Sequence, residues 1–170
     1  MIISDYLLRE KMQEDGLSNQ KIRDILQKTK TIAMVGLSGN WYRPSYFAAK
    51  YLLEKGFEVI PINPNYDEIL GEKSYPSLKD MKRKVDVVNL FQRADQAPKF
   101  LADAKEAGAK IFWMQLGIVN MEASRTASEL GMTAVMDRCM KIEYARLFGG
   151  LTWSGVNTGI ISASRPKKIP

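Results

Sequence analysis

Short apolar runs alternate with amphipathic segments through most of the chain. The runs predict five strands, at residues 31–37, 57–62, 85–91, 110–116 and 132–136. Apolar residues follow one another within each run, which indicates strands that are buried on both faces. The amphipathic segments predict helices at 44–55, 95–107, 121–130 and 139–148. Strands that alternate with helices in this way are typical of β-α-β units.

Glycine follows three of these expected helices, as Gly56, Gly108 and Gly131. A glycine just after the last helical residue readily adopts the left-handed conformation that ends a helix. Because β-α-β crossovers are right-handed, successive strands of this kind pair in parallel. The pattern therefore predicts an α/β fold, a Rossmann-like, doubly wound sheet of five parallel strands with flanking helices.

The two ends of the chain depart from this pattern. Residues 1–30 are polar and helical in character, with a break at Asp15, and Ser18 can then cap a second helix. Residues 149–170 combine glycines with the basic stretch RPKK and predict an irregular basic tail. We therefore expect a helical N-terminal extension at 1–30, one α/β domain at 31–148, and a tail at 149–170.

Composition narrows the chemistry. A chain of 170 residues with 45% hydrophobic residues can form one domain with a substantial core. The absence of histidine excludes Ser-His-Asp and Cys-His nucleophiles and imidazole bases. The single cysteine excludes an internal disulfide and a thiolate metal site, and it indicates a reducing, cytoplasmic compartment. No apolar stretch approaches the roughly 18 residues of a membrane helix, so we expect no membrane partner.

The formal net charge of +6 favours anionic partners. Nucleic acid is one such partner, and a phosphorylated small molecule is another. Apart from residues 79–84 and 165–168, the positive charge is scattered, and no base-stacking motif accompanies it. We therefore expect a small-molecule ligand and no nucleic acid.

The segment between the first strand and the following helix has the features of a phosphate-binding loop. In an open parallel sheet, ligands bind beyond the carboxyl ends of the strands. Gly36 and Gly39 allow tight turns, and Pro44 suits the first turn of a helix, whose free amides favour an anion. Further donors suited to phosphate accompany them: Ser38, Arg43 and Ser45. The alternative is an ordinary glycine turn before a capped helix.

A nicotinamide dinucleotide fits this loop less well. Folds that bind such ligands end their second strand near an acid that holds the ribose, whereas this second strand ends at Asn63 and Pro64, with no carboxylate before Asp67. The first turn also lacks the full G-x-G-x-x-G spacing. An NAD(P)-dependent oxidoreductase is therefore the alternative function, and a pyrophosphate ligand whose neighbouring sugar needs no acid is preferred.

Five stretches occur in a specific order: VGLSGNWYRPSY (35–46), VIPINPNYDEILGEKSYPSL (59–78), VDVVNLFQR (85–93), WMQLGIVN (113–120) and MDRCMKIEYARL (136–147). In this order they resemble the small single-domain CoA-binding proteins. The fold of that family is similar to the N-terminal CoA-binding domain of the succinyl-CoA synthetase alpha subunit. The resemblance covers residues 31–148, leaves out both ends, and implies coenzyme A or an acyl-CoA as the cofactor.

The resemblance also implies which residues bind each part of coenzyme A. The first loop would hold the pyrophosphate, through Gly36, Leu37, Ser38, Arg43, Pro44 and Ser45. The loop after the second strand would lie beside the adenosine end, through Asn63 and Pro64. After the third strand, Phe91 would pack on adenine or pantetheine and Arg93 would bind phosphate. The end of the fourth strand would line the pantetheine path, through Gln115, Leu116 and Gly117.

Simpler interpretations stand beside these assignments. The pair Asn63–Pro64 suits an ordinary turn, Phe91 a core position, and Arg93 a solvated charge. Cys139 also has two interpretations. Asp137 can cap the last helix and place the thiol near free amides, which would lower the thiol pKa and favour a mixed disulfide with a thiol cofactor. A buried, inert thiol is the preferred alternative.

This chain departs from the family pattern at one position. The last motif of the family commonly has histidine before Ala-Arg, where this chain has Tyr144. The related ligases also carry a phosphorylated histidine on a second domain, and this chain has no histidine. We therefore expect a protein without catalytic residues that acts as a carrier, sensor or accessory protein. A homo-oligomer and a catalytic partner protein both remain open.

Overall fold

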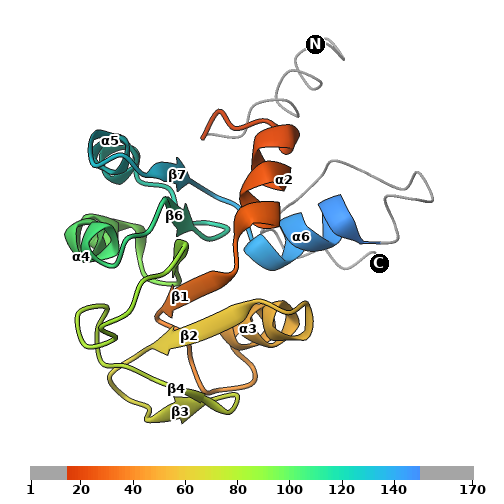
Figure 1. Ribbon diagram of the computed structural model, residues 1–170, viewed down its shortest axis with the longest axis vertical. Coiled ribbons are helices and arrows are strands. Elements are labelled where there is room, and N and C mark those ends of the chain that lie inside the picture. Colours follow the sequence, from red (N-terminus) through yellow and green to blue (C-terminus); the bar gives the residue numbers. More distant parts are fainter. Residues whose placement is uncertain (1–14, 150–170) are drawn as a thin grey trace, which may run out of the picture.

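The computed structural model describes residues 15–149 of the chain (Figure 1). The helix that we expected before Asp15 and the tail after Gly149 lie outside the described residues. No helix within residues 15–149 is long and apolar enough to cross a membrane.

Five parallel strands form the central sheet: β1 (Thr31–Val35), β2 (Glu58–Ile62), β5 (Val87–Leu90), β6 (Ile111–Met114) and β7 (Thr133–Val135). Their order in the sheet is β2-β1-β5-β6-β7. This confirms the predicted α/β fold with a five-stranded parallel sheet. Each strand is shorter than the apolar run that predicted it, and β1 stops before Gly36, which takes a φ of 83°.

The order of the strands reverses between β1 and β5. From β1 the chain runs to β2 on one side, and it then crosses to β5, β6 and β7 on the other side. Val35 and Leu90 are neighbours at the carboxyl ends of β1 and β5. Because the loops after these strands leave in opposite directions, they open the crevice in which α/β folds bind ligands.

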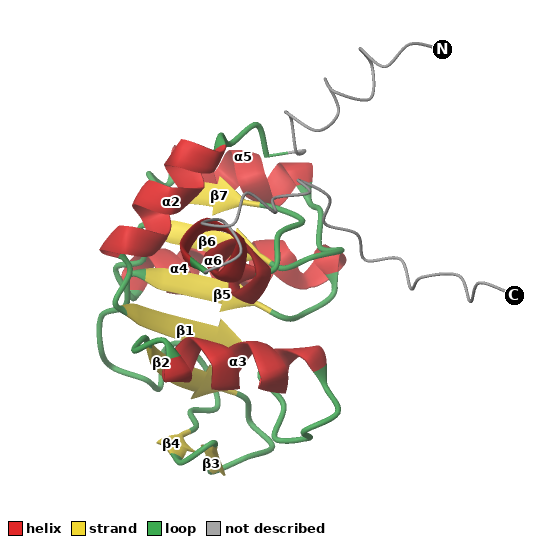
Figure 2. Ribbon diagram, turned by 90° about the vertical axis from the view of Figure 1, so that its right-hand side faces the viewer, coloured by secondary structure: helices red, strands yellow, loops and turns green. Residues whose placement is uncertain are grey.

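Helices cover both faces of the sheet (Figure 2). One face is covered by α2 (Asn19–Lys28), α3 (Pro44–Glu54) and α6 (Met140–Phe148), and the other by η1 (Ala94–Phe100), α4 (Leu101–Glu106) and α5 (Met121–Glu129). The oxygen of Ser18 accepts a hydrogen bond of 3.2 Å from the amide of Lys21, as the predicted cap of α2 requires. The three predicted stop glycines all have φ between 77° and 88°.

Two local features differ from the prediction. The helix expected at 95–107 is a 3-10 helix followed by the short α4, because Pro98 lacks the amide that an α-helical turn needs. A small hairpin of β3 (Glu68–Ile69) and β4 (Glu72–Lys73) was not predicted. Its strands have two residues each, too few to show a period of two in the sequence.

Candidate functional site

The loop after β1 lies directly against the loop after β5. A Cβ atom at Gly36 would lie 2.6 Å from the carbonyl oxygen of Phe91 and 2.9 Å from the Nε2 atom of Gln92. Gly36 also has a left-handed φ of 83°. Both observations require glycine at this position. The first residue of the predicted phosphate loop therefore lies at the crevice between β1 and β5.

Hydrogen bonds within the loop fix its shape. The amide of Ser38 donates to Ser45 Oγ at 3.1 Å, and the amide of Asn40 donates to Ser38 Oγ at 3.1 Å. The amide of Tyr42 donates to Asn40 Oδ1 at 3.0 Å. A hydroxyl that accepts a hydrogen bond can still donate one. The two serines thus hold the loop and keep their own O–H groups for a ligand.

Other donors of the same loop have no acceptor. Within residues 15–149, no group accepts a hydrogen bond from the backbone amides of Gly39, Trp41 or Ser45. Arg43 precedes the first residue of α3, its side chain is exposed, and no residue that the structure describes pairs with it. Open amides and a cation at the start of an 11-residue helix favour an anionic ligand.

The loop after β2 is tied to the phosphate loop. Asn63 Nδ2 donates to the carbonyl oxygen of Leu37 at 2.9 Å, while its Oδ1 accepts from the amide of Asn65. The side chain therefore makes the expected turn and also joins two loops. The Tyr66 ring lies against Gly39, where a Cβ atom would come within 2.6 Å of it. Pro64 is exposed on the same loop. Where dinucleotide folds hold the ribose with an acid, this chain has an amide engaged by the backbone.

A cavity of about 820 Å³ opens beside the phosphate loop. It lies at the carboxyl edge of the sheet, between the starts of α3 and α6 and the loops after β5 and β6. Most of its lining is apolar: Tyr42, Pro44, Phe47, Phe91, Gln92, Arg93, Gln115, Leu116, Ile118, Cys139, Lys141 and Ile142. Five of the predicted site residues therefore line one cavity: Pro44, Phe91, Arg93, Gln115 and Leu116.

The other predicted residues lie around this cavity without lining it. Six of them belong to the two loops joined by Asn63: Gly36, Leu37, Ser38, Arg43, Ser45 and Pro64. Gly117 lies beyond β6, and its amide donates to Asp137 Oδ1 at 2.6 Å. The structure thus separates a polar cradle after β1 from an apolar cavity between the later loops.

Three predicted cavity residues also have structural partners. Gln115 is buried, and its Nε2 donates to Asn89 Oδ1 at 2.7 Å, as expected of an amide at a strand end. Phe91 is half-buried, and it packs on the core while it lines the cavity. Arg93 forms an exposed ion pair with Asp95 at 3.0 Å, so the solvated-charge interpretation also holds for it.

Sequence reasoning missed most of the apolar cavity wall: Tyr42, Phe47, Ile118 and Ile142. Tyr42 and Phe47 flank the start of α3 and are 72% and 48% exposed. The sequence does contain a signal for these two residues. They are aromatic side chains beside the predicted phosphate loop, around the start of a helix whose core positions are occupied by small residues such as Ala48 and Ala49, so they are not needed for the core. Nothing comparable marked the two isoleucines, because isolated isoleucines are usual in helices and loops of a core.

Cys139 corrects one expectation. It is the residue before α6, and the nearby backbone amides of Ile142 and Lys141 favour its charged form. Burial nevertheless raises the pKa of the Cys139 thiol, and this effect outweighs the lowering by those two amides. Asp137 does not cap the helix, because it takes a φ of 52° and accepts from Gly117 instead. The expectation of a lowered thiol pKa is therefore wrong, and Cys139 is a half-buried thiol on the cavity wall.

A buried ion cluster holds α6 in place. Arg138 donates to Asp15 at 2.8 Å and to the carbonyl oxygen of Leu17 at 2.8 Å, and it approaches Glu143 at 3.5 Å. Arg146 donates to Glu143 at 2.6 Å. The side chains of Asp15, Arg138 and Glu143 are at most 3% exposed. The cluster joins the segment before α2 to the helix that carries part of the cavity wall.

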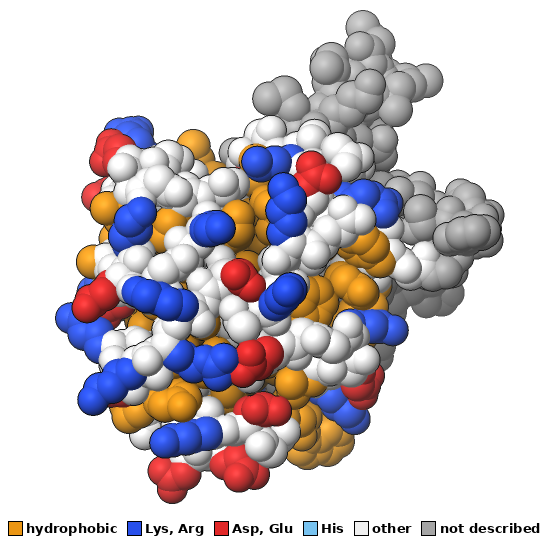
Figure 3. Space-filling model, in the orientation of Figure 1, with side chains coloured by type: hydrophobic (Ala, Val, Ile, Leu, Met, Phe, Trp, Pro, Cys, Tyr) orange, Lys and Arg blue, Asp and Glu red, His pale blue; other side chains and the backbone are white. Residues whose placement is uncertain are grey.

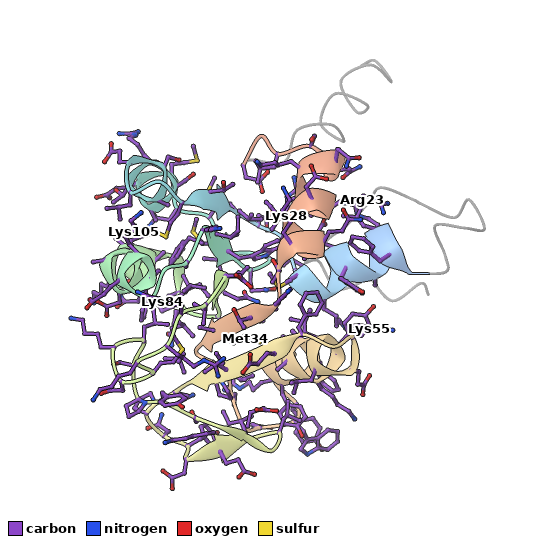
Figure 4. The ribbon with its side chains drawn as sticks, viewed as in Figure 1. Arg23, Lys28, Met34, Lys55, Lys84 and Lys105 are labelled. Atoms are coloured by element: carbon purple, nitrogen blue, oxygen red, sulfur yellow. The ribbon has the colours of Figure 1, made fainter. Side chains whose placement is uncertain are left out.

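A second cavity, of about 550 Å³, lies at the opposite, amino edge of the sheet. Four cations line it, together with two acids and two apolar side chains: Leu78, Lys79, Lys82, Arg83, Lys84, Asp103, Glu106 and Ala107. Lys84, beside α4 in Figure 4, donates to the carbonyl oxygen of Glu106 at 2.6 Å. Basic side chains elsewhere are interspersed with acidic ones on the face shown in Figure 3.

Within the described part of the chain, no group of three or more acids, cysteines or histidines could hold a metal ion. The candidate site comprises the loop after β1, with its open amides and the Arg43 guanidinium, and the apolar cavity beside it.

Comparison with known proteins agrees with this arrangement. A family model described as CoA binding domain matches residues 30–145. The chain is 42% identical over 128 residues to the uncharacterized protein YneT of Bacillus subtilis, which covers 75% of this chain and 95% of that protein. A hypothetical protein from Pyrococcus horikoshii OT3 has 43% identity and a TM-score of 0.78, covering 81% of this chain and 97% of the other.

One longer relative is similar to this protein over only a small part of the relative's own length. The ADP-forming acetate–CoA ligase II of Archaeoglobus fulgidus is 32% identical over 91 residues, which are 52% of this chain and 13% of the ligase. The family model, by contrast, spans more than half of this chain. The chain therefore belongs to the CoA binding domain family.

Proposed function

We propose that this chain binds coenzyme A or an acyl-CoA through the loop after β1, as a carrier, sensor or accessory protein without catalytic residues of its own. The observation that carries the proposal is the set of open donors at the start of α3. The amides of Gly39, Trp41 and Ser45 accompany the guanidinium of Arg43, and none of these groups has a partner within residues 15–149. A diphosphate supplies the acceptors that these donors need.

The rest of the site supports coenzyme A over a nicotinamide dinucleotide. The side chain at the end of β2 is Asn63, whose amide is engaged by Leu37 and Asn65, so no carboxylate is present to hold a ribose diol. The cavity beyond the loop is mainly apolar, and the buried Gln115 on its wall offers an amide to the pantetheine arm. Among known relatives, the acetate–CoA ligase acts on a CoA substrate by its name and shares this region of the chain.

The test is a comparison of coenzyme A with NAD in thermal unfolding and calorimetry. A ligand at 100 times its Kd stabilises the folded protein by about 2.7 kcal/mol, which raises the Tm of a chain of this size by roughly 5–10 °C. We expect this shift with coenzyme A and none with NAD at the same concentration. A shift with NAD that equals or exceeds the shift with coenzyme A contradicts the proposal and favours an oxidoreductase.

The single cysteine supplies an independent measurement. Cys139 lies on the cavity wall, so a bound pantetheine arm should shield its thiol. We expect acetyl-CoA, which has no free thiol to consume the reagent, to slow alkylation of Cys139 by iodoacetamide several-fold, as followed by mass spectrometry, and NAD to leave the rate unchanged. Native mass spectrometry of the same sample reports the bound molecule and the number of subunits.

A further inference from the structure

The apolar cavity is continuous with the phosphate loop. Tyr42 belongs to that loop and Pro44 begins α3, and both residues line the cavity. From the phosphate loop, the cavity extends toward the start of α6, where Cys139 and Ile142 form its far wall. A ligand held by its diphosphate at the loop can therefore extend along this open cavity.

The wall of this cavity is mainly apolar and carries no acidic side chain from the described residues. Aromatic and aliphatic side chains dominate it. Arg93 is already paired with Asp95. Phe47 remains 48% exposed although it faces a concave site. Concave apolar surface of this kind is typical of sites that bury an apolar ligand group.

The size of the cavity also exceeds what a thiol needs. Sites for drug-sized ligands enclose roughly 300–1,000 Å³, and this cavity, at about 820 Å³, lies in the upper part of that range. The polar amides of a pantetheine arm find a partner in Gln115, which is oriented by Asn89. Phe47 and Ile142 add apolar surface to the same wall, and a free thiol is a small group for a cavity of this size.

We propose that this cavity receives the apolar acyl group of an acyl-CoA, so that the preferred ligand carries an uncharged aliphatic chain on its sulfur. The proposal rests on the proposed function, because the phosphate loop must first hold the coenzyme A part. Transfer of each methylene from water to an apolar site tightens binding by up to about fourfold. Affinity therefore rises with chain length until the cavity is filled.

Calorimetry with coenzyme A and its acetyl, butyryl and hexanoyl thioesters tests this proposal. We expect Kd to fall by about two- to fourfold for each added methylene, so that hexanoyl-CoA binds at least tenfold more tightly than acetyl-CoA. Equal Kd values for all four ligands would show that pantetheine alone occupies the cavity and would overturn the proposal. If coenzyme A itself does not bind, the proposed function fails as a whole.

A matched pair of ligands separates apolar from charged acyl groups. Butyryl-CoA and succinyl-CoA both carry four-carbon acyl groups, but the succinyl group ends in a carboxylate. Most of the cavity wall is apolar, and burial of a carboxylate against apolar side chains is costly, so the cavity should favour butyryl-CoA by about tenfold or more. Lys141, the cavity cation that has no partner among the described residues, is the group that could reverse this preference. Tighter binding of succinyl-CoA would overturn the proposal.

Phe47→Ala tests the wall itself. We expect the ratio of the acetyl-CoA Kd to the hexanoyl-CoA Kd to fall at least threefold in this variant, because part of the chain loses its apolar contact. Met121→Ala is the control, since Met121 is an exposed apolar residue at the start of α5 that does not line the cavity. An unchanged ratio in Phe47→Ala would place the chain elsewhere and contradict the proposal.

Discussion

At the amino edge of the sheet, most cations are already paired with neighbouring acceptors, whereas at the carboxyl edge the phosphate loop keeps its donors open. Of the four cations around the amino-edge cavity, Lys79 pairs with Asp103, Arg83 with Glu58, and Lys84 with the carbonyl oxygen of Glu106. The loop after β1 has one cation, Arg43, and several amides that no described residue accepts a hydrogen bond from. It is therefore the unpaired donors, and not the number of charges, on which we base the proposed anion site.

The two edges also differ in how they use ion pairs for stability. Arg83 and Glu58 form a pair whose side chains are both more than one third exposed, so water screens it. Arg138, at the carboxyl edge, is buried together with Asp15 and Glu143. Removal of one partner from a buried cluster leaves an uncompensated charge in a poorly solvated place. The strongest contrast between the edges should therefore appear in variants of these two arginines.

The largest expected effect is that of Arg138→Leu. It leaves the carboxylate of Asp15 buried without its cation, and we expect the free energy of unfolding to fall by about 3–5 kcal/mol. Arg83→Leu is the matched control and should change that free energy by less than about 1 kcal/mol. Urea denaturation measures both. Similar losses in the two variants would contradict the contrast between the edges.

Gly36→Ala should have the next largest effect. A left-handed alanine costs about 1–2 kcal/mol, and displacement of the Phe91 carbonyl adds on the order of 1–2 kcal/mol. We expect a loss of about 2–4 kcal/mol in unfolding free energy and weaker binding of coenzyme A. Gly56→Ala, at the amino edge, has a similar φ but open space around its Cβ position, so only the first cost applies. Equal losses in both variants would show that the contact with Phe91 is unimportant.

The substitutions Arg43→Ala and Arg83→Ala compare the contributions of the two edges to the affinity for coenzyme A. Loss of a charge-assisted contact with phosphate should weaken the affinity for coenzyme A by about 1.5–3 kcal/mol, or roughly 10- to 150-fold in Kd. The exposed side chain of Arg43 has no described partner, so the thermal stability of the free protein should not change. Calorimetry with Arg83→Ala, which removes the same charge from the amino edge, should give the original affinity. Unchanged affinity in Arg43→Ala removes this residue from the site.

The smallest expected effect concerns Asp86, at the amino edge. Burial raises its pKa, but hydrogen bonds from the amides of Thr31 and Lys30 and from the Thr31 hydroxyl lower it further, so the net pKa lies below the ordinary value. A carboxyl with a lowered folded pKa stabilises the fold above its unfolded pKa, and the stabilisation is lost as pH falls through the folded pKa.

We expect Asp86→Asn to reduce the free energy of unfolding by about 1 kcal/mol at neutral pH and by less at acidic pH, as the pH falls through the folded pKa of the original carboxyl. Urea denaturation at the two pH values measures the difference. A loss that grows toward acidic pH would show that the net pKa of Asp86 is raised and would contradict this assignment.

The parts of the fold that depend on local pattern were predictable from the sequence. Unbroken apolar runs identified the five strands, and Gly56, Gly108 and Gly131 identified helix ends, because both signals act within a few neighbouring residues. The effect of Pro98 within an otherwise helical pattern was missed, although its missing amide is also a local property. The β3-β4 hairpin was missed because its strands are too short to show a pattern.

The candidate site divides in the same way. The proposed phosphate loop is contiguous in sequence, so its glycines, serines and Arg43 could be put forward together as one candidate. The apolar cavity combines side chains from four separate segments, and no spacing in the sequence relates Phe47 to Ile142. The pKa of the Cys139 thiol likewise depends on residues that are far from it in the sequence. Its neighbouring amides were correctly expected from sequence, but the burial that decides its pKa arises from the packing of the whole domain.

Two successive residues of α6 belong to different parts of the structure. Ile142 lines the cavity, and the next residue, Glu143, is held inside the ion cluster with Arg138 and Arg146. Rotation of this helix about its axis would displace both residues together. The ion pair of Asp15 with Arg138 therefore resists rotation of the helix that forms part of the cavity wall. A substitution of Asp15, more than one hundred residues away from Ile142 in the sequence, should weaken binding at the proposed site.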